Sequence, residues 1–288
     1  MFFQILINSI IAGSIYSLLA YGFTLILSTL NFFNLSHGIA FTLAAYFSYV
    51  LRIKLHLNLL FSFALSIIIT TAAMLGVYRV AYFPLRARRA PSWVLIVGSL
   101  GVATFMEALI TFVFGSDLVS LRIGETRPGY LLGSAIITQV QLWMLGISIA
   151  VMIVLSTFIK RTKTGKAMRA VSNDGEMSGI VGINIERICF STFALGAALT
   201  AVAGNLVSLE QDLFPTMGQA ALLKAIVAGT VGAHGSIPGA LFGGFFLGII
   251  ENFGIWHINA SWKDGIALLV LVVFILFRPK FFGGEMEK

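Results

Sequence analysis

Charged residues are scarce in this chain. They make up 11% of its 288 residues, whereas hydrophobic residues make up 58%. A soluble domain carries about 25% charged residues, because it needs a polar shell around its core. In a chain of 288 residues, so few charges cannot supply such a shell. The sequence therefore predicts an integral membrane protein.

Cysteine is also nearly absent, since Cys189 is the only one. This excludes a disulfide within the chain, and no Cys/His cluster suggests a metal site. Lys163-Thr164-Gly165-Lys166 has the end of a phosphate-binding loop, but Ala167 follows it and the required earlier glycine is missing. Hydrolase and zinc-protease motifs are absent as well. We therefore expect no enzymatic chemistry, no cofactor and no metal.

Long apolar runs dominate what is present. About 20 mostly apolar residues suffice for a membrane-spanning helix. The sequence predicts an all-α, polytopic transmembrane bundle formed by residues 1–288 as a single domain. It should have about eight to nine membrane segments, two of them broken or re-entrant. The clear segments are 5–27, 57–79, 92–114, 139–159 and 188–209, with a shorter run at 262–277 and interrupted runs at 31–51 and 219–254.

Basic residues set the expected orientation of these segments. The formal charge is +7, but Lys and Arg gather in loops between apolar runs, which favours membrane topology over nucleic-acid binding. Loops 79–91 and 160–187 are basic, as is the tail from Arg278, and these should be cytoplasmic. Arg52 and Lys54 are an exception to the pattern.

The remaining loops should lie outside. Loop 115–138 is balanced in charge and loop 210–218 is acidic. The chain is then outside near residue 214 and inside after residue 278. Because the last run crosses once, the stretch 219–254 must cross twice, or re-enter and return.

Small residues recur at four-residue steps in the second half of the chain. This spacing lets helix backbones approach closely in lipid. Tight helix packing is the favoured interpretation, and sliding between thin helices is the functional alternative. The expected packing residues are Gly196, Gly204, Gly235, Pro238, Gly239, Gly243 and Gly248.

Polar groups within or beside apolar runs are candidates for a translocation pathway, because such groups are costly in lipid. Broken helices commonly build transporter substrate sites. Structural alternatives stay open: a hydrogen-bonded helix end for His37, and ion pairing or an interfacial position for Lys224 and Glu251. The pathway candidates are Asn34, Ser36, His37, Glu107, Lys224 and His234.

The 160–187 loop contains a helix signal. Asn173 and Glu176 fit a capping box with Asn173 as N-cap, and an apolar stripe at Met177, Ile180 and Val181 follows. These residues predict a short amphipathic helix. It could lie in the lipid interface or dock on a partner.

Several motifs together resemble the branched-chain amino-acid ABC transporter permeases. Asn34-Leu35-Ser36-His37-Gly38 resembles that family's Asn-Phe-Ala-His-Gly signature, although Leu35 and Ser36 replace the commoner Phe and Ala. Lys163–Ala170 resembles the family's cytoplasmic loop. Further matches follow in order at Gly235–Ala240 and Phe277–Pro279, but His234 departs from the usual pattern.

The resemblance implies a multi-pass permease subunit of an importer in the inner (cytoplasmic) membrane. Its implied partners are a second homologous permease subunit, two cytoplasmic ABC ATPase subunits and an extracytoplasmic solute-binding protein. It implies transport of branched-chain amino acids, whereas similar permeases import urea, short amides or aromatic acids. It also favours ATPase coupling for the short helix, through Asn173, Asp174, Glu176, Met177, Ile180 and Val181. An ion-coupled secondary transporter is the main alternative, ahead of an intramembrane enzyme or a channel.

Overall fold

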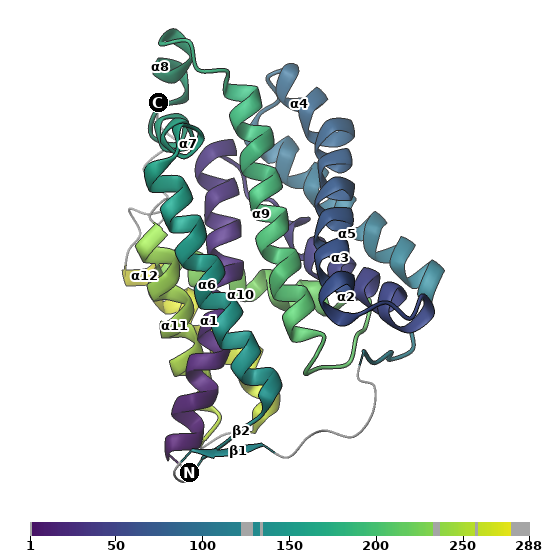
Figure 1. Ribbon diagram of the computed structural model, residues 1–288. Coiled ribbons are helices and arrows are strands. Elements are labelled where there is room, and N and C mark those ends of the chain that lie inside the picture. Colours follow the sequence, from purple (N-terminus) through teal and green to yellow (C-terminus); the bar gives the residue numbers. More distant parts are fainter. Residues whose placement is uncertain (1, 122–128, 133–134, 233–236, 257–258, 278–288) are drawn as a thin grey trace.

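The computed structural model describes residues 2–121, 129–132, 135–232, 237–256 and 259–277. They form a bundle of helices with one small hairpin (Figure 1). The long helices are α1 (Phe2–Leu30), α3 (Leu59–Val77), α5 (Ser92–Phe114), α6 (Gln139–Arg161), α9 (Ile185–Val207) and α11 (Ile237–Gly254). The shorter ones are α2 (His37–Tyr49), α4 (Phe83–Ala87), α7 (Lys163–Asn173), α8 (Gly175–Ile180), α10 (Met217–Val231) and α12 (Lys263–Phe277).

Five helices in the described chain are long and apolar enough to cross a membrane. They match the five clear segments expected from the sequence, and α3 continues through a π-helical turn at Tyr78–Tyr82 into α4. The expected count of eight to nine segments also includes shorter helices. Their length alone does not establish that they cross the membrane. The first interrupted run contains the 13-residue α2, and the second is divided into α10 and α11.

Helix α1 forms the centre of the bundle. Most of its residues are buried, and it packs against α9, α10 and α11. Glycines make the α1–α11 contact close: a Cβ added at Gly248 would lie 2.6 Å from the backbone nitrogen of Gly13, and one at Gly244 would collide with Ser17. A longer side chain at either position would separate the two backbones.

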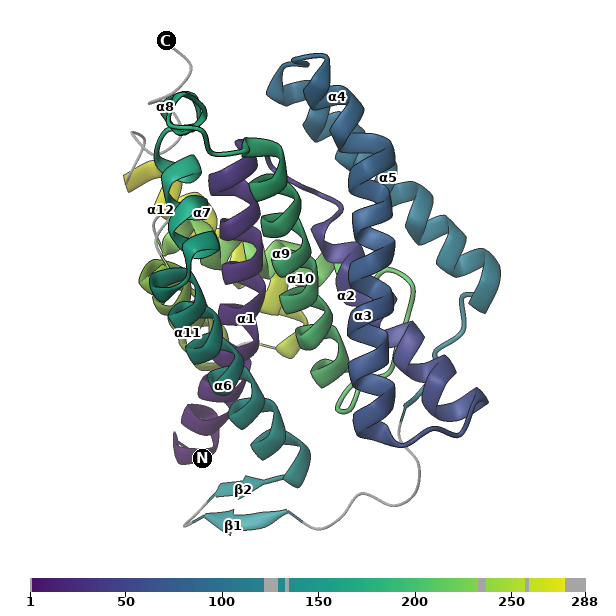
Figure 2. The same ribbon diagram turned by 45° about the horizontal axis from the view of Figure 1, so that its top comes forward.

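The outer helices carry an apolar surface. Large hydrophobic side chains such as Ile68 on α3, Phe112 on α5 and Val154 on α6 are exposed. Both views place α5 at the edge of the bundle (Figures 1 and 2). A surface of this kind suits lipid or another apolar helix, so composition and fold agree on a multi-pass membrane protein.

A two-stranded hairpin is an exception to the all-α expectation. Strands β1 (Tyr130–Leu132) and β2 (Ala135–Ile137) are antiparallel. The side chain of Gln4 on α1 extends this pairing: its Nε2 donates to the carbonyl of Ile136 at 3.0 Å, and its Oε1 accepts from the Ile136 amide at 2.8 Å. The hairpin is therefore fixed to the start of α1.

The two strongly basic loops lie at the opposite end of the bundle from the balanced loop 115–138 and the acidic loop 210–218. Helices α4, α7 and α8 are at one end, and the hairpin and the N-terminus are at the other (Figure 1). At the hairpin end, Val119 and Leu213 form an isolated antiparallel bridge between the two loops expected outside. The two described basic loops, 79–91 and 160–187, thus share one end, as the charge pattern predicts, whereas the tail from Arg278 lies outside the described residues.

Candidate functional site

The first break lies between α1 and α2 and is buried. Asn34 Oδ1 accepts hydrogen bonds from the Ser36 amide at 3.1 Å and from the Ser36 hydroxyl at 2.8 Å. The Tyr82 hydroxyl donates to the same oxygen at 3.1 Å, and the Ser99 hydroxyl accepts from the Leu35 amide at 3.0 Å. Non-helical backbone at membrane depth needs such internal partners. Asn34 and Ser36 therefore stabilise the break locally.

His37 begins helix α2, and Gly38 follows it within the helix, so the irregular stretch ends earlier than the sequence suggested. The His37 ring is buried, with Nε2 2.7 Å from the hydroxyl of Thr200 on α9 and an edge contact to Phe23. This geometry matches the hydrogen-bonded helix end that was one of the two interpretations of His37.

Two short helices meet at their N-terminal ends. A Cβ added at Gly38, near the start of α2, would collide with the carbonyl oxygen of Gly218 at the start of α10, and the reverse also holds. Thr42 also contacts the Gly218 position. The two interrupted regions of the sequence are thus brought together inside the bundle.

The second break differs from expectation within the described residues. Pro238 and Gly239 lie in the first turn of α11 rather than in an irregular segment, a position that proline tolerates because its missing N–H has no helical partner there. His234 and Gly235 lie outside the described residues. A Cβ at Gly243 would collide with the carbonyl of Ala228, so α10 and α11 also pack through their backbones.

The two other packing glycines lie on α9. A Cβ at Gly196 would lie 3.0 Å from the carbonyl oxygen of Gly22 on α1, and one at Gly204 would collide with the carbonyl of Phe41 on α2. Helix α9 therefore approaches both α1 and α2 closely at these positions.

Lys224 is the centre of an ionic cluster in which Lys224 and Glu251 are buried and Asp264 is exposed. Its ammonium pairs with Glu251 on α11 and with Asp264 on α12, the latter at 2.8 Å. Glu251 also accepts a hydrogen bond from the hydroxyl of Tyr16 on α1. The cluster joins α10 to three other helices. Glu251 was expected as a possible pair, but the sequence did not predict Tyr16 or Asp264 as partners in this cluster.

Glu107 has a partner on another helix. Its carboxylate accepts a hydrogen bond from Gln219 Nε2 of α10 at 2.8 Å, at a partly exposed position on α5. The contact joins the start of α10 to an edge helix. Glu107, a pathway candidate in the sequence, therefore also has a structural role as a contact between helices.

A polar network that the sequence did not predict links α2, α3 and α9. The hydroxyl of Ser48 donates to Asn205 Oδ1 at 2.6 Å, and Asn205 Nδ2 donates to the Ser66 hydroxyl at the same distance. All three side chains are buried. Single serine and asparagine residues on three separate helices form no sequence motif, so no sequence signal marks that they meet.

The short helix in the basic loop exists, but its capping differs from expectation. Asn173 is the last residue of α7, and the N-cap of α8 is Asp174, whose carboxylate accepts from the Met177 amide at 2.9 Å. The assignment of Asn173 as N-cap is therefore wrong. Glu176 lies in the first turn of α8, where an acidic side chain complements the helix dipole.

Helix α8 projects from the bundle while α7 is anchored to it. Met168 and Val171 of α7 are buried together with Ile188 of α9. By contrast, the three apolar side chains of α8 and its C-cap are largely exposed: Met177 to 60%, Ile180 to 80% and Val181 to 81%. An exposed apolar stripe on an anchored projection is typical of a docking surface.

A second charged cluster lies just beyond α8. Glu186, in the first turn of α9, accepts a hydrogen bond from Tyr78 and lies 3.7 Å from the Arg86 guanidinium. Arg86 also donates to the carbonyl of Leu30 at the end of α1 at 3.2 Å. The segment that carries α8 is therefore tied to α1, α3 and α4.

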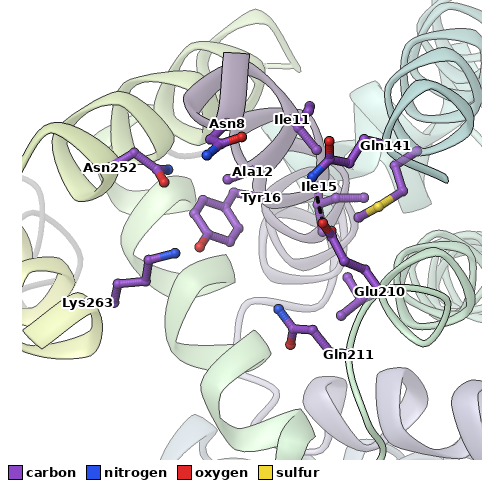
Figure 3. A pocket seen from close by; sticks show the side chains of 12 residues that line it. Asn8, Ile11, Ala12, Ile15, Tyr16, Gln141, Glu210, Gln211, Asn252 and Lys263 are labelled. Atoms are coloured by element: carbon purple, nitrogen blue, oxygen red, sulfur yellow. Dashed lines mark hydrogen bonds between the residues drawn. The ribbon is translucent and has the colours of Figure 1, made fainter. Parts of the chain in front are cut away.

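A cavity of about 240 Å³ lies at the opposite end, between α1, α6, the end of α9, α11 and α12. One water needs only about 10–15 Å³, so the cavity can hold a small solute. Figure 3 shows polar side chains around it. They are Asn8, Gln141, Glu210, Gln211, Asn252 and Lys263.

Comparisons with known proteins identify the family. A family model described as branched-chain amino acid transport system / permease component matches residues 5–275. The chain belongs to this permease family. It is 32% identical to the high-affinity branched-chain amino acid transport system permease protein BraD of Pseudomonas aeruginosa, over 99% of this chain and 97% of BraD. It is 30% identical to LivH of Escherichia coli, a permease protein of the same description, over 99% of this chain and 96% of LivH.

A solved structure has a similar fold. The chain matches PsaBC from Streptococcus pneumoniae in complex with Fab with a TM-score of 0.52 and 16% identity, over 99% of this chain and 94% of that one. At this identity the match concerns the fold alone.

Proposed function

We propose that this permease is a subunit of an ABC importer for branched-chain amino acids or a related small polar solute. It forms the translocation pathway with a second, homologous permease subunit. Two ATPase subunits bind at the α8 end, and a solute-binding protein delivers cargo at the hairpin end. The relatives BraD and LivH support the cargo, because both are named for branched-chain amino acid transport.

The exposed apolar stripe of α8 is the observation that carries this proposal. Complete burial of one such side chain is worth about 1.5–3 kcal/mol, so Met177, Ile180 and Val181 together can hold a partner firmly. Because α7 packs on the bundle and Glu186 is bonded to Tyr78, force on α8 reaches the membrane helices. Helix α8 therefore acts as the coupling helix, capped by Asp174.

The pathway is supported by the two interrupted regions. Asn34, Ser36 and His37 lie at the start of α2, which contacts the start of α10 through Gly38 and Gly218. Short helices that begin inside the membrane leave polar backbone groups there, and such groups commonly line transport pathways. Glu107 contacts the same end of α10.

Replacing Met177 or Ile180 by Asp tests the coupling role. The permease is co-expressed with its host's ATPase subunits, and the co-purified ATPase and ATP hydrolysis stimulated by the binding protein are measured. Either variant should insert normally but lose ATPase association or stimulation. Leu131→Asp is the matched control for ATPase association alone, because Leu131 is 76% exposed on β1 at the other end, where the binding protein would dock. Wild-type association and hydrolysis in both α8 variants would refute the coupling assignment.

One observation favours the alternative of an ion-coupled secondary transporter. Lys224, Glu251 and Asp264 are ionisable groups clustered among membrane helices, and such groups often belong to ion pathways. Uptake into vesicles separates the two functions. The importer requires ATP inside the vesicle and tolerates a protonophore, whereas a proton-coupled transporter shows the opposite dependence.

A further inference from the structure

The geometry points to the cavity between α1, α6, α11 and α12 as a binding site for a zwitterionic amino acid with an apolar side chain. The site lies within one permease subunit, at the end where the binding protein would deliver cargo. This inference rests on the proposed function and adds to it a place and a chemical class for the ligand.

The cavity carries opposite charges on opposite sides. Figure 3 shows Lys263 and Asn252 on one side, with Glu210 and Gln141 across from them. Lys263 comes from the start of α12, and Glu210 follows the end of α9. An ammonium and a carboxylate that face one space select a ligand carrying both charges, because a single charge would satisfy one side and be repelled by the other.

Hydrogen-bonding groups flank each charge. Gln141 Nε2 donates to Glu210 at 2.8 Å, which holds the carboxylate in place. On the other side, Asn252 Nδ2 donates to the carbonyl of Gly248 at 2.8 Å, which fixes its carboxamide. The Glu210 carboxylate and the Asn252 carboxamide are therefore held by the fold before a ligand arrives, and preorganisation of this kind improves affinity.

The surface between the charged sides is apolar. Ile11 and Ile15 of α1, Met144 of α6 and Val207 of α9 line it. A ligand carboxylate near Lys263 and an ammonium near Glu210 would leave an aliphatic or aromatic side chain against these residues. A lipid phosphate fits less well, because Glu210 repels it.

The site also adjoins the ionic cluster. Tyr16 lines the cavity, and its hydroxyl donates to Glu251, the partner of Lys224 on α10. A ligand in the cavity therefore contacts a residue that is bonded to the interrupted region of the bundle.

Binding to the full-length chain in phosphatidylcholine nanodiscs tests the inference. Radiolabelled leucine and phenylalanine are the probes. Isocaproate, which lacks the ammonium of leucine, and isoamylamine, which lacks its carboxylate, are competitors. We expect saturable binding of at least one amino acid and little competition by either analogue. Lys263→Met and Glu210→Gln should each weaken binding at least about tenfold, equivalent to about 1.4 kcal/mol.

Matched controls remove equivalent charges elsewhere. Lys160→Met at the end of α6 and Asp117→Asn after α5 change exposed residues away from the cavity, and both should bind as wild type. If Lys263→Met or Glu210→Gln does not purify as a monodisperse protein, Gln211→Lys replaces it. Gln211 is exposed, and an added cation beside Glu210 should weaken binding of the ligand ammonium.

Three results would overturn the inference: no binding of either amino acid, unchanged binding in the cavity variants, or competition by isocaproate equal to that of leucine. The last would indicate a simple anion site, such as one for a lipid phosphate. ATP-driven uptake by the assembled importer is measured in parallel. Normal uptake without binding in the cavity would reject the site and leave the proposed function standing, whereas absent wild-type uptake would reject the proposed function.

Discussion

Replacing Lys224 by Met should destabilise the bundle by about 3 kcal/mol. Its side chain is 7% exposed and that of its partner Glu251 is fully buried. Removing one member of a buried ion pair costs about 3–5 kcal/mol, because the other charge is left uncompensated. For Lys224→Met the cost should lie at the lower end of this range. Glu251 keeps its hydrogen bond from Tyr16, and Asp264 is 61% exposed, so water can solvate it.

The free energy of unfolding in mixed detergent micelles measures this cost. The double variant Lys224→Met/Glu251→Gln should recover most of the lost stability, because it removes the buried charge together with its partner. Lys160→Met, an exposed change, should alter stability by less than about 0.5 kcal/mol. A double variant as unstable as the single one would show that the cost comes from lost packing around the lysine stem, and would refute the ion-pair reasoning.

Two further predictions concern packing and topology. Gly218→Ala should destabilise by about 1–3 kcal/mol, because the added methyl collides with Gly38. Gly101→Ala, with nothing within 4 Å, should instead stabilise by up to about 1 kcal/mol through helix propensity. Equal unfolding free energies of the two variants would contradict the close α2–α10 contact. Single cysteines at Arg88 and Lys166, in a chain lacking Cys189, should resist an impermeant thiol reagent applied from outside, whereas Asp117→Cys should be labelled. Lys166 is preferred to Gly165, where a Cβ would collide with the Ile159 backbone. Labelling of the cysteine at position 88 from outside would show that the orientation is the reverse of the one predicted.

Helix α8 shows which features local sequence can predict. A polar turn followed by Met177, Ile180 and Val181 predicts a short helix, and the structure contains one. The cap was misassigned by one residue because Asn173 and Asp174 both favour N-cap positions. The choice depends on where α7 ends, and α7 continues through Asn173 because Met168 and Val171 pack against α9.

The five long membrane segments and the grouping of the basic loops follow directly from the amino-acid sequence. Both depend on local properties: the length of an apolar run and the number of Lys and Arg residues beside it. Which polar groups meet depends instead on how the helices pack. Lys224, Glu251 and Asp264 lie on three helices, and only the packing of α10, α11 and α12 makes them one cluster. The same is true of the Gly38–Gly218 contact. In a bilayer, lipid and neighbouring helices are equally apolar, so the hydrophobic pattern of a helix does not indicate which face meets protein.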